Sequence, residues 1–81
     1  MVIKVIGTGC EKCARLYQNV QQAVTELGVN AEIRKVEDLM EMVQLGVMSA
    51  PSLMIDGKLV VSGRVPSVKA ITEILGAQGR R

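Results

Sequence analysis

The sequence contains no histidine, tryptophan or phenylalanine, and it has only two cysteines among its 81 residues. A tetrahedral structural zinc site takes four protein ligands, which are usually cysteine or histidine. Two cysteines and no histidine leave such a site two ligands short. The composition therefore argues strongly against a structural zinc centre formed within one chain.

Aromatic side chains are almost absent, since Tyr17 is the single one. Proteins that bind single-stranded nucleic acid stack bases on aromatic rings beside a basic groove. Here the formal charge is only +2, and the basic residues are interleaved with acids. A nucleic-acid partner is therefore not expected, and the core must be built from aliphatic and methionine side chains.

Long hydrophobic runs are also missing. No apolar stretch approaches the roughly 20 residues that span a bilayer, and the N-terminus shows no basic segment or cleavage site of a secretory signal. We therefore expect no membrane partner and a cytoplasmic location. In that reducing compartment, a cysteine pair is more often catalytic or metal-binding than structural.

The length of the chain allows one small domain, which we predict to span residues 1–78, with residues 79–81 as a disordered tail. Hydrophobic periodicity and turn residues predict seven elements in the order βαβαββα. These are a strand at 2–6, a helix at 11–27 stopped by Gly28, a strand at 31–36, a short helix capped by Asp38 and stopped by Gly46, strands at 52–55 and 58–61, and a helix capped by Ser67 and ended by Gly76.

This order predicts an α/β fold with a mixed four-stranded sheet and helices on both faces. The first strand, helix and next strand form a βαβ unit, whose strands should be parallel. Asp56-Gly57 between two β-type runs is a strong hairpin signal, so the last two strands should be antiparallel neighbours.

The two cysteines, Cys10 and Cys13, lie where the first strand gives way to the long helix. Two intervening residues bring their sulfurs close enough for a disulfide. The first thiol would face unpaired N–H groups and the positive end of the helix dipole, which favour a thiolate. Because a thiolate attacks disulfides, the pair is a candidate redox centre.

Three segments together resemble the thioredoxin superfamily, and within it the small, glutaredoxin-sized redox-active disulfide proteins of archaea and bacteria. They are residues 8–13, residues 46–53, and residues 55–58 followed by Gly63. The resemblance covers roughly residues 2–76. It implies a thioredoxin fold and a thiol–disulfide oxidoreductase without a cofactor. Its substrates would be protein or small-molecule disulfides, and the sequence leaves open whether the electron donor is a flavin-dependent reductase, glutathione or another dithiol. We expect a monomer, but the sequence leaves the oligomeric state open.

The resemblance also implies roles for individual residues. Cys10 would attack the substrate and Cys13 would resolve the mixed disulfide. Pro51 would be the family's cis-proline, with the backbone of Ala50 pairing to an extended substrate segment. Gly63 would let the substrate backbone approach from the other side.

Three features, at four positions, depart from the family pattern. Gly9 replaces the usual aromatic residue before the first cysteine. Glu11 and Lys12 replace a proline-containing pair, and they modulate the site in opposite directions: Glu11 opposes the thiolate and Lys12 favours it. Lys4 lies where larger thioredoxins carry a buried acid. The redox potential is therefore not predicted by the sequence.

Two other functions remain open. A Gly-Thr-Gly-Cys-x-x-Cys loop also resembles the Cu(I)-binding loop of small metallochaperones, although those domains have a βαββαβ order. The second is a thioredoxin-fold interaction module with inert cysteines.

Several other side chains have simpler interpretations. We expect Tyr17 in the core, Met40, Met42 and Met54 as core gap-fillers, and Lys58 and Arg64 as solvated charges, and we keep Met48 as a candidate substrate contact.

Overall fold

The computed structural model describes residues 1–7 and 11–79 of the chain. Its seven elements follow the predicted order. They are β1 (Val2–Ile6), α1 (Glu11–Leu27), β2 (Glu32–Val36), α2 (Leu39–Gln44), β3 (Ser52–Ile55), β4 (Lys58–Ser62) and α3 (Val68–Gly79).

The strands form one four-stranded sheet in the order β2-β1-β3-β4. β1 is parallel to β2, whereas β3 is antiparallel to both β1 and β4. Central β1 is buried on both faces, with Ile3 and Val5 on one side and Ile6 on the other. The predicted parallel βαβ unit and the mixed sheet are both confirmed.

The hairpin between β3 and β4 turns at Asp56 and Gly57. Both residues have positive φ, +49° and +82°, as a two-residue type I′ turn requires. Asp56 also ties the hairpin to β1: its N–H donates to the carbonyl oxygen of Val2, and its Oδ1 accepts from the N–H of Val2, each at 2.8 Å.

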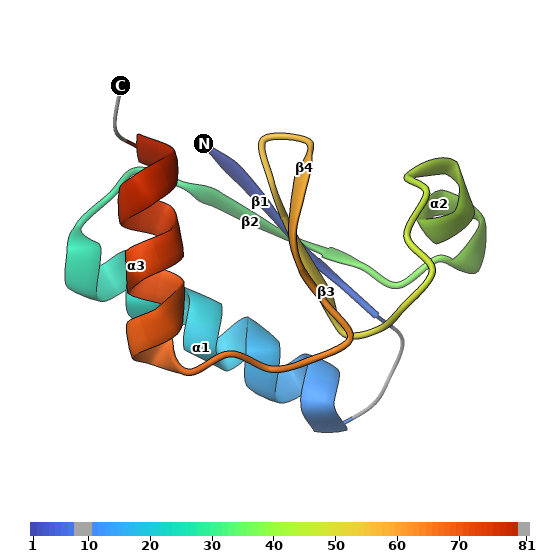
Figure 1. Cartoon of the computed structure of the whole chain (residues 1–81), viewed down its shortest axis with the longest axis horizontal. Helices are drawn as coiled ribbons and strands as arrows, with labels where there is room; N and C mark the ends of the chain where they lie inside the picture. Colours follow the sequence, from blue (N-terminus) through green and yellow to red (C-terminus); the bar gives the residue numbers. More distant parts are fainter. Residues whose placement is uncertain (8–10, 80–81) are drawn as a thin grey trace.

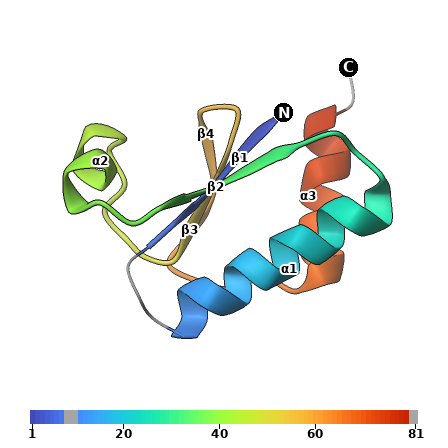
Figure 2. The ribbon, with the colours of Figure 1, turned by 180° about the vertical axis from the view of Figure 1, so that it is seen from behind.

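Helices cover both faces of the sheet, as predicted. α1 and α3 lie together on one side, and α2 lies apart from them near the other end of the sheet (Figure 1). The view from behind shows the same separation (Figure 2). The larger core lies between the sheet and the α1–α3 pair and includes Leu16, Val20, Leu53, Ile71 and Leu75. The smaller core packs α2 on the opposite face, mainly through Met42, Met54 and Val36.

The predicted end of α1 and both predicted ends of α2 are confirmed. α1 ends before Gly28, which has φ +65°. The Oδ1 of Asp38 accepts from the N–H of Met40 at 3.2 Å at the start of α2, and Gly46 follows that helix with φ +75°.

Some predictions about helix ends and apolar faces were wrong. Gly76 lies inside α3, which runs to Gly79, so the predicted helix end at Gly76 is wrong. The division into a domain at residues 1–78 and a tail at residues 79–81 stays a prediction. A glycine inside a helix costs only about 0.5–1 kcal/mol, which the burial of Ile71 and Leu75 on the same helix outweighs.

Met40 is 65 % exposed, so it is not a core residue. α2 has only six residues, and it turns Met42 alone into the core. Met42 and Met54 are buried, as expected of gap-fillers.

Replacing Ser67 with alanine tests the cap of α3. The Oγ of Ser67 accepts from the N–H of Ala70 at 3.1 Å. Its loss is expected to lower the free energy of unfolding by about 1 kcal/mol, as measured by urea denaturation. Ser67→Asp keeps an acceptor at the same place and should remain close to the wild type. An equal loss in both variants would contradict the assigned cap.

Candidate active site

Cys13 lies in the first turn of α1, at the edge of the sheet where β1 ends. Its side chain is only 9 % exposed. Cys10 directly precedes α1 in the sequence and lies outside the described residues. The predicted closeness of the two sulfurs and the ionisation of the Cys10 thiol therefore stay predictions.

Gly7, the residue after β1, lies directly beside the sulfur of Cys13. It is buried, it has φ +154°, and its N–H donates to the carbonyl oxygen of Val36 at 2.9 Å. A Cβ placed on Gly7 would overlap the Sγ of Cys13. Sequence analysis treated Gly7 only as the end of a strand, because nothing in a lone glycine shows which side chain approaches it.

The Ala50-Pro51 peptide bond is cis, as the resemblance implied. Pro51 is buried, and a Cβ on Gly7 would lie 3.5 Å from the Cβ of Ala50. The loop is closed by Ser52, whose Oγ donates to the carbonyl oxygen of Ser49. The loop carrying Pro51 therefore lies beside Gly7, on which Cys13 also packs.

Gly63 lies next to the same loop. Its N–H donates to the carbonyl oxygen of Pro51 at 2.9 Å, and its φ is +74°. The structure thus brings together residues from three distant parts of the sequence, namely Cys13, Ala50, Pro51 and Gly63. Their contact with a substrate stays a prediction.

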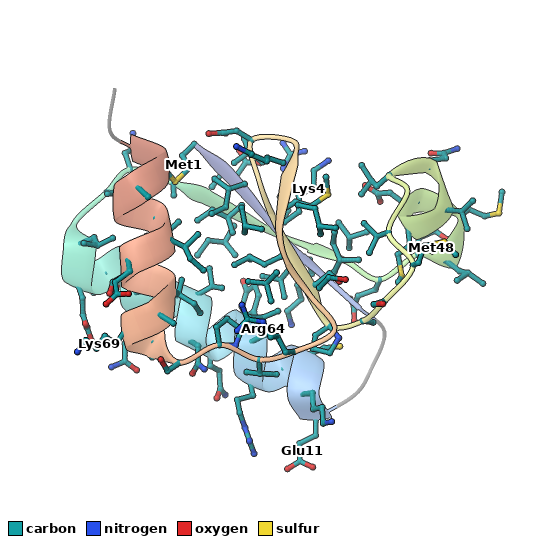
Figure 3. All side chains as sticks on the ribbon, viewed as in Figure 1. Met1, Lys4, Glu11, Met48, Arg64 and Lys69 are labelled. Carbon is teal, nitrogen blue, oxygen red and sulfur yellow. The ribbon has the colours of Figure 1, made fainter. Side chains whose placement is uncertain are left out.

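The other predicted site residues lie at the surface. Glu11 and Lys12 are exposed in the first turn of α1, and Glu11 projects away from the body of the protein (Figure 3). Met48 lies between α2 and β3 and is 96 % exposed, a position open to a partner (Figure 3). Lys58 and Arg64 are exposed, as expected.

A cavity of about 240 Å³ opens beside Cys13, between α1 and the ends of β1 and β2. Its lining is mainly apolar, with three polar or charged side chains at Tyr17, Lys35 and Glu37. The Nζ of Lys35 lies 4.5 Å from the centre of the Tyr17 ring. Tyr17 is half-buried and packs against the larger core, as predicted, but it also faces this cavity.

Sequence analysis missed Lys35 and Glu37 as neighbours of the cysteine site. The signal that could have found them is the parallel pairing of β1 with β2, which sets Ile6 beside Val36. Carboxyl ends of parallel strands meet at one edge of the sheet, so residues near the end of β2 belong to the same edge as the cysteine loop.

The metallochaperone alternative gains no support from the structure. The chain ends in helix α3 rather than in the final strand of a βαββαβ domain.

Comparison with known proteins identifies the family. The sequence model of the family described as "Thioredoxin domain" matches residues 1–76. The chain belongs to the thioredoxin family. A thioredoxin of Methanothermobacter thermautotrophicus is 40 % identical over 75 residues, which cover 93 % of this chain and 97 % of that protein. A thioredoxin of Methanocaldococcus jannaschii is 45 % identical over 75 residues, covering 93 % and 86 % of the two chains.

The thioredoxin fold predicted from the sequence is therefore confirmed, and the chain is a thioredoxin-like redox protein. None of its described helices has the length and apolar character needed to cross a membrane.

Proposed function

We propose that this thioredoxin-like protein reduces disulfide bonds in protein substrates through Cys10 and Cys13. The thiolate of Cys10 attacks one sulfur of the substrate disulfide, and the other substrate sulfur leaves as a thiolate. The thiolate of Cys13 then attacks the sulfur of Cys10 in the mixed disulfide. The second substrate sulfur leaves as a thiolate, and the two electrons gained by the substrate are balanced by the new Cys10–Cys13 bond.

The observation that carries this proposal is the burial of Cys13 against Gly7, beside the loop of the cis bond before Pro51. A buried sulfur is slow to meet outside disulfides but can still attack a neighbour held one helical turn away. The two cysteines therefore have different tasks: Cys10 meets the substrate and Cys13 releases it.

The loop at Ala50 and Pro51, together with Gly63, is the proposed contact surface for the substrate. An extended peptide can pair with exposed backbone groups as an added strand would. The positive φ of Gly63 and its exposed position leave its backbone open to such a segment. The proposed electron donor is a dithiol or a flavin-dependent reductase, and the proposed location is the cytoplasm.

A redox titration with thiol trapping tests the proposal. The protein is equilibrated in buffers of graded potential, and its free thiols are then alkylated and counted by mass spectrometry. We expect one two-electron transition in the cytosolic range of about −220 to −320 mV. Cys10→Ser and Cys13→Ser serve as controls, since a single cysteine cannot form the internal bond. The absence of any transition in the wild type would reject the oxidoreductase role.

A further inference from the structure

The cavity beside Cys13 is lined by both the buried Cys13 and the ammonium-bearing side chain of Lys35. Val5 and Gly7 of the β1 side contribute no charge to its wall. The titratable groups on the described part of the wall are Cys13 and Tyr17 from α1, with Lys35 and Glu37 from the β2 side. In the described part of the chain, the recorded salt bridge joins Arg34 to Glu32, so Lys35 is not committed to a carboxylate there.

Tyr17 restricts the position of Lys35. A lysine side chain has four rotatable carbon–carbon bonds and is normally mobile at a surface. The Nζ of Lys35 lies 4.5 Å from the centre of the Tyr17 ring, inside the distance of about 6 Å at which an aromatic face attracts a cation. Tyr17 also packs against the larger core, and this packing fixes the position of its ring.

We infer that Lys35, held over the ring of Tyr17, stabilises the thiolate of Cys13 across this cavity and so speeds the release of the reduced substrate. Burial disfavours a thiolate, whereas a nearby positive charge favours it. Lys35 supplies that charge, and Glu37 on the same wall opposes it. Tyr17 acts through Lys35 and is therefore a positioning residue.

The inference rests on the proposed function, because it concerns the second half of the exchange. Cys13 loses its thiol proton to solvent, and Lys35 takes no part in that proton transfer. The thiolate of Cys13 then forms the bond to the sulfur of Cys10, and the substrate sulfur departs as a thiolate that takes up a proton from water. Lys35 changes how much of Cys13 is ionised, while the atoms and electrons exchanged stay the same.

The experiment measures the ionisation of Cys13 without any disulfide exchange. In the Cys10→Ser protein, Cys13 is the only thiol, and its alkylation by iodoacetamide is followed across a range of pH. The midpoint of the profile reports ionisation, and the limiting rate at high pH reports access to the sulfur. This separation is needed because shortening a side chain on the cavity wall can also widen the entrance.

Lys35→Met removes the charge while keeping much of the side-chain volume. Near neutral pH, we expect it to slow alkylation roughly three- to tenfold and to move the midpoint to higher pH, with the limiting rate preserved. Lys35→Arg should restore the parent profile. Lys58→Met carries the same change of net charge at the exposed start of β4, outside the cavity wall, and should leave the profile unchanged.

Tyr17 and Glu37 give two further tests. Tyr17→Phe keeps an aromatic face and should match the parent, whereas Tyr17→Leu should move the midpoint in the same direction as Lys35→Met. Glu37→Gln should move it to lower pH, because a negative charge leaves the cavity wall. Far-UV circular dichroism checks that each variant is folded.

An unchanged midpoint in folded Lys35→Met, or an equal shift in Lys58→Met, would overturn the inference while leaving the oxidoreductase role intact. Conversely, failure of the redox titration would remove that role without altering the alkylation profiles. The two failures are therefore distinguishable.

Discussion

Replacing Cys10 with serine is expected to lower disulfide reductase activity by more than about a thousandfold. A serine hydroxyl is not ionised near neutral pH, and an oxygen cannot exchange with a disulfide sulfur. Residues that act as one catalytic unit show losses of this order when one member is removed. The reduction of a model protein disulfide by the variant, coupled to dithiothreitol as electron donor, measures the effect.

Replacing Cys13 with serine should give a different defect. Cys10 still attacks the substrate, but nothing internal releases it, so covalent complexes accumulate. They should appear on non-reducing gels and disappear on addition of dithiothreitol. The double variant Cys10→Ser with Cys13→Ser is the control and should form none. Equal trapping by Cys10→Ser alone would contradict the assigned order of attack.

Replacing Gly7 with alanine is expected to cost about 2–5 kcal/mol of the free energy of unfolding. The new Cβ would overlap the sulfur of Cys13, and the residue would keep a φ of +154° that side chains rarely adopt. Overpacking a core contributes about 1–3 kcal/mol and backbone strain a similar amount. The total free energy of unfolding of a domain of this size is only about 4–12 kcal/mol, so urea denaturation should show the loss clearly.

Gly28→Ala is the matched control for this prediction. Gly28 also has positive φ, at +65°, but a Cβ there would meet nothing within 4 Å. Gly28→Ala should therefore lower the free energy of unfolding by only about 1 kcal/mol, which is the cost of the left-handed backbone conformation for alanine. If the two variants lose the same amount, the close approach of Gly7 to Cys13 is not what makes this glycine necessary.

Local patterns were enough to predict most of the fold. Helix α1 was predicted from apolar spacing and from the stop at Gly28, and the hairpin from Asp56-Gly57, because these signals arise from residues close together in the sequence. Helix α3 was predicted too short at Gly76, since a glycine ends a helix only when tertiary packing does not favour its continuation.

The candidate site was predicted less completely. The resemblance pointed to Cys10, Cys13, Pro51, Ala50 and Gly63, and the structure brings the last four of these together. Composition alone would not have indicated that the bond before Pro51 is cis, because only about 5–6 % of such bonds in folded proteins are.

The sequence by itself determined the order of the elements, the parallel pairing of β1 with β2, the antiparallel hairpin of β3 and β4, and the place of the two cysteines at the end of the first strand. These follow from side-chain periodicity and turn chemistry, which act over a few residues. The antiparallel pairing of β1 with β3 came only from the structure. Only the tertiary structure decided that Gly7 touches Cys13 and that Tyr17 holds Lys35 in a cavity beside that sulfur. Such contacts join residues from different elements and depend on how helices pack against the sheet. A local sequence pattern does not determine how close those residues come.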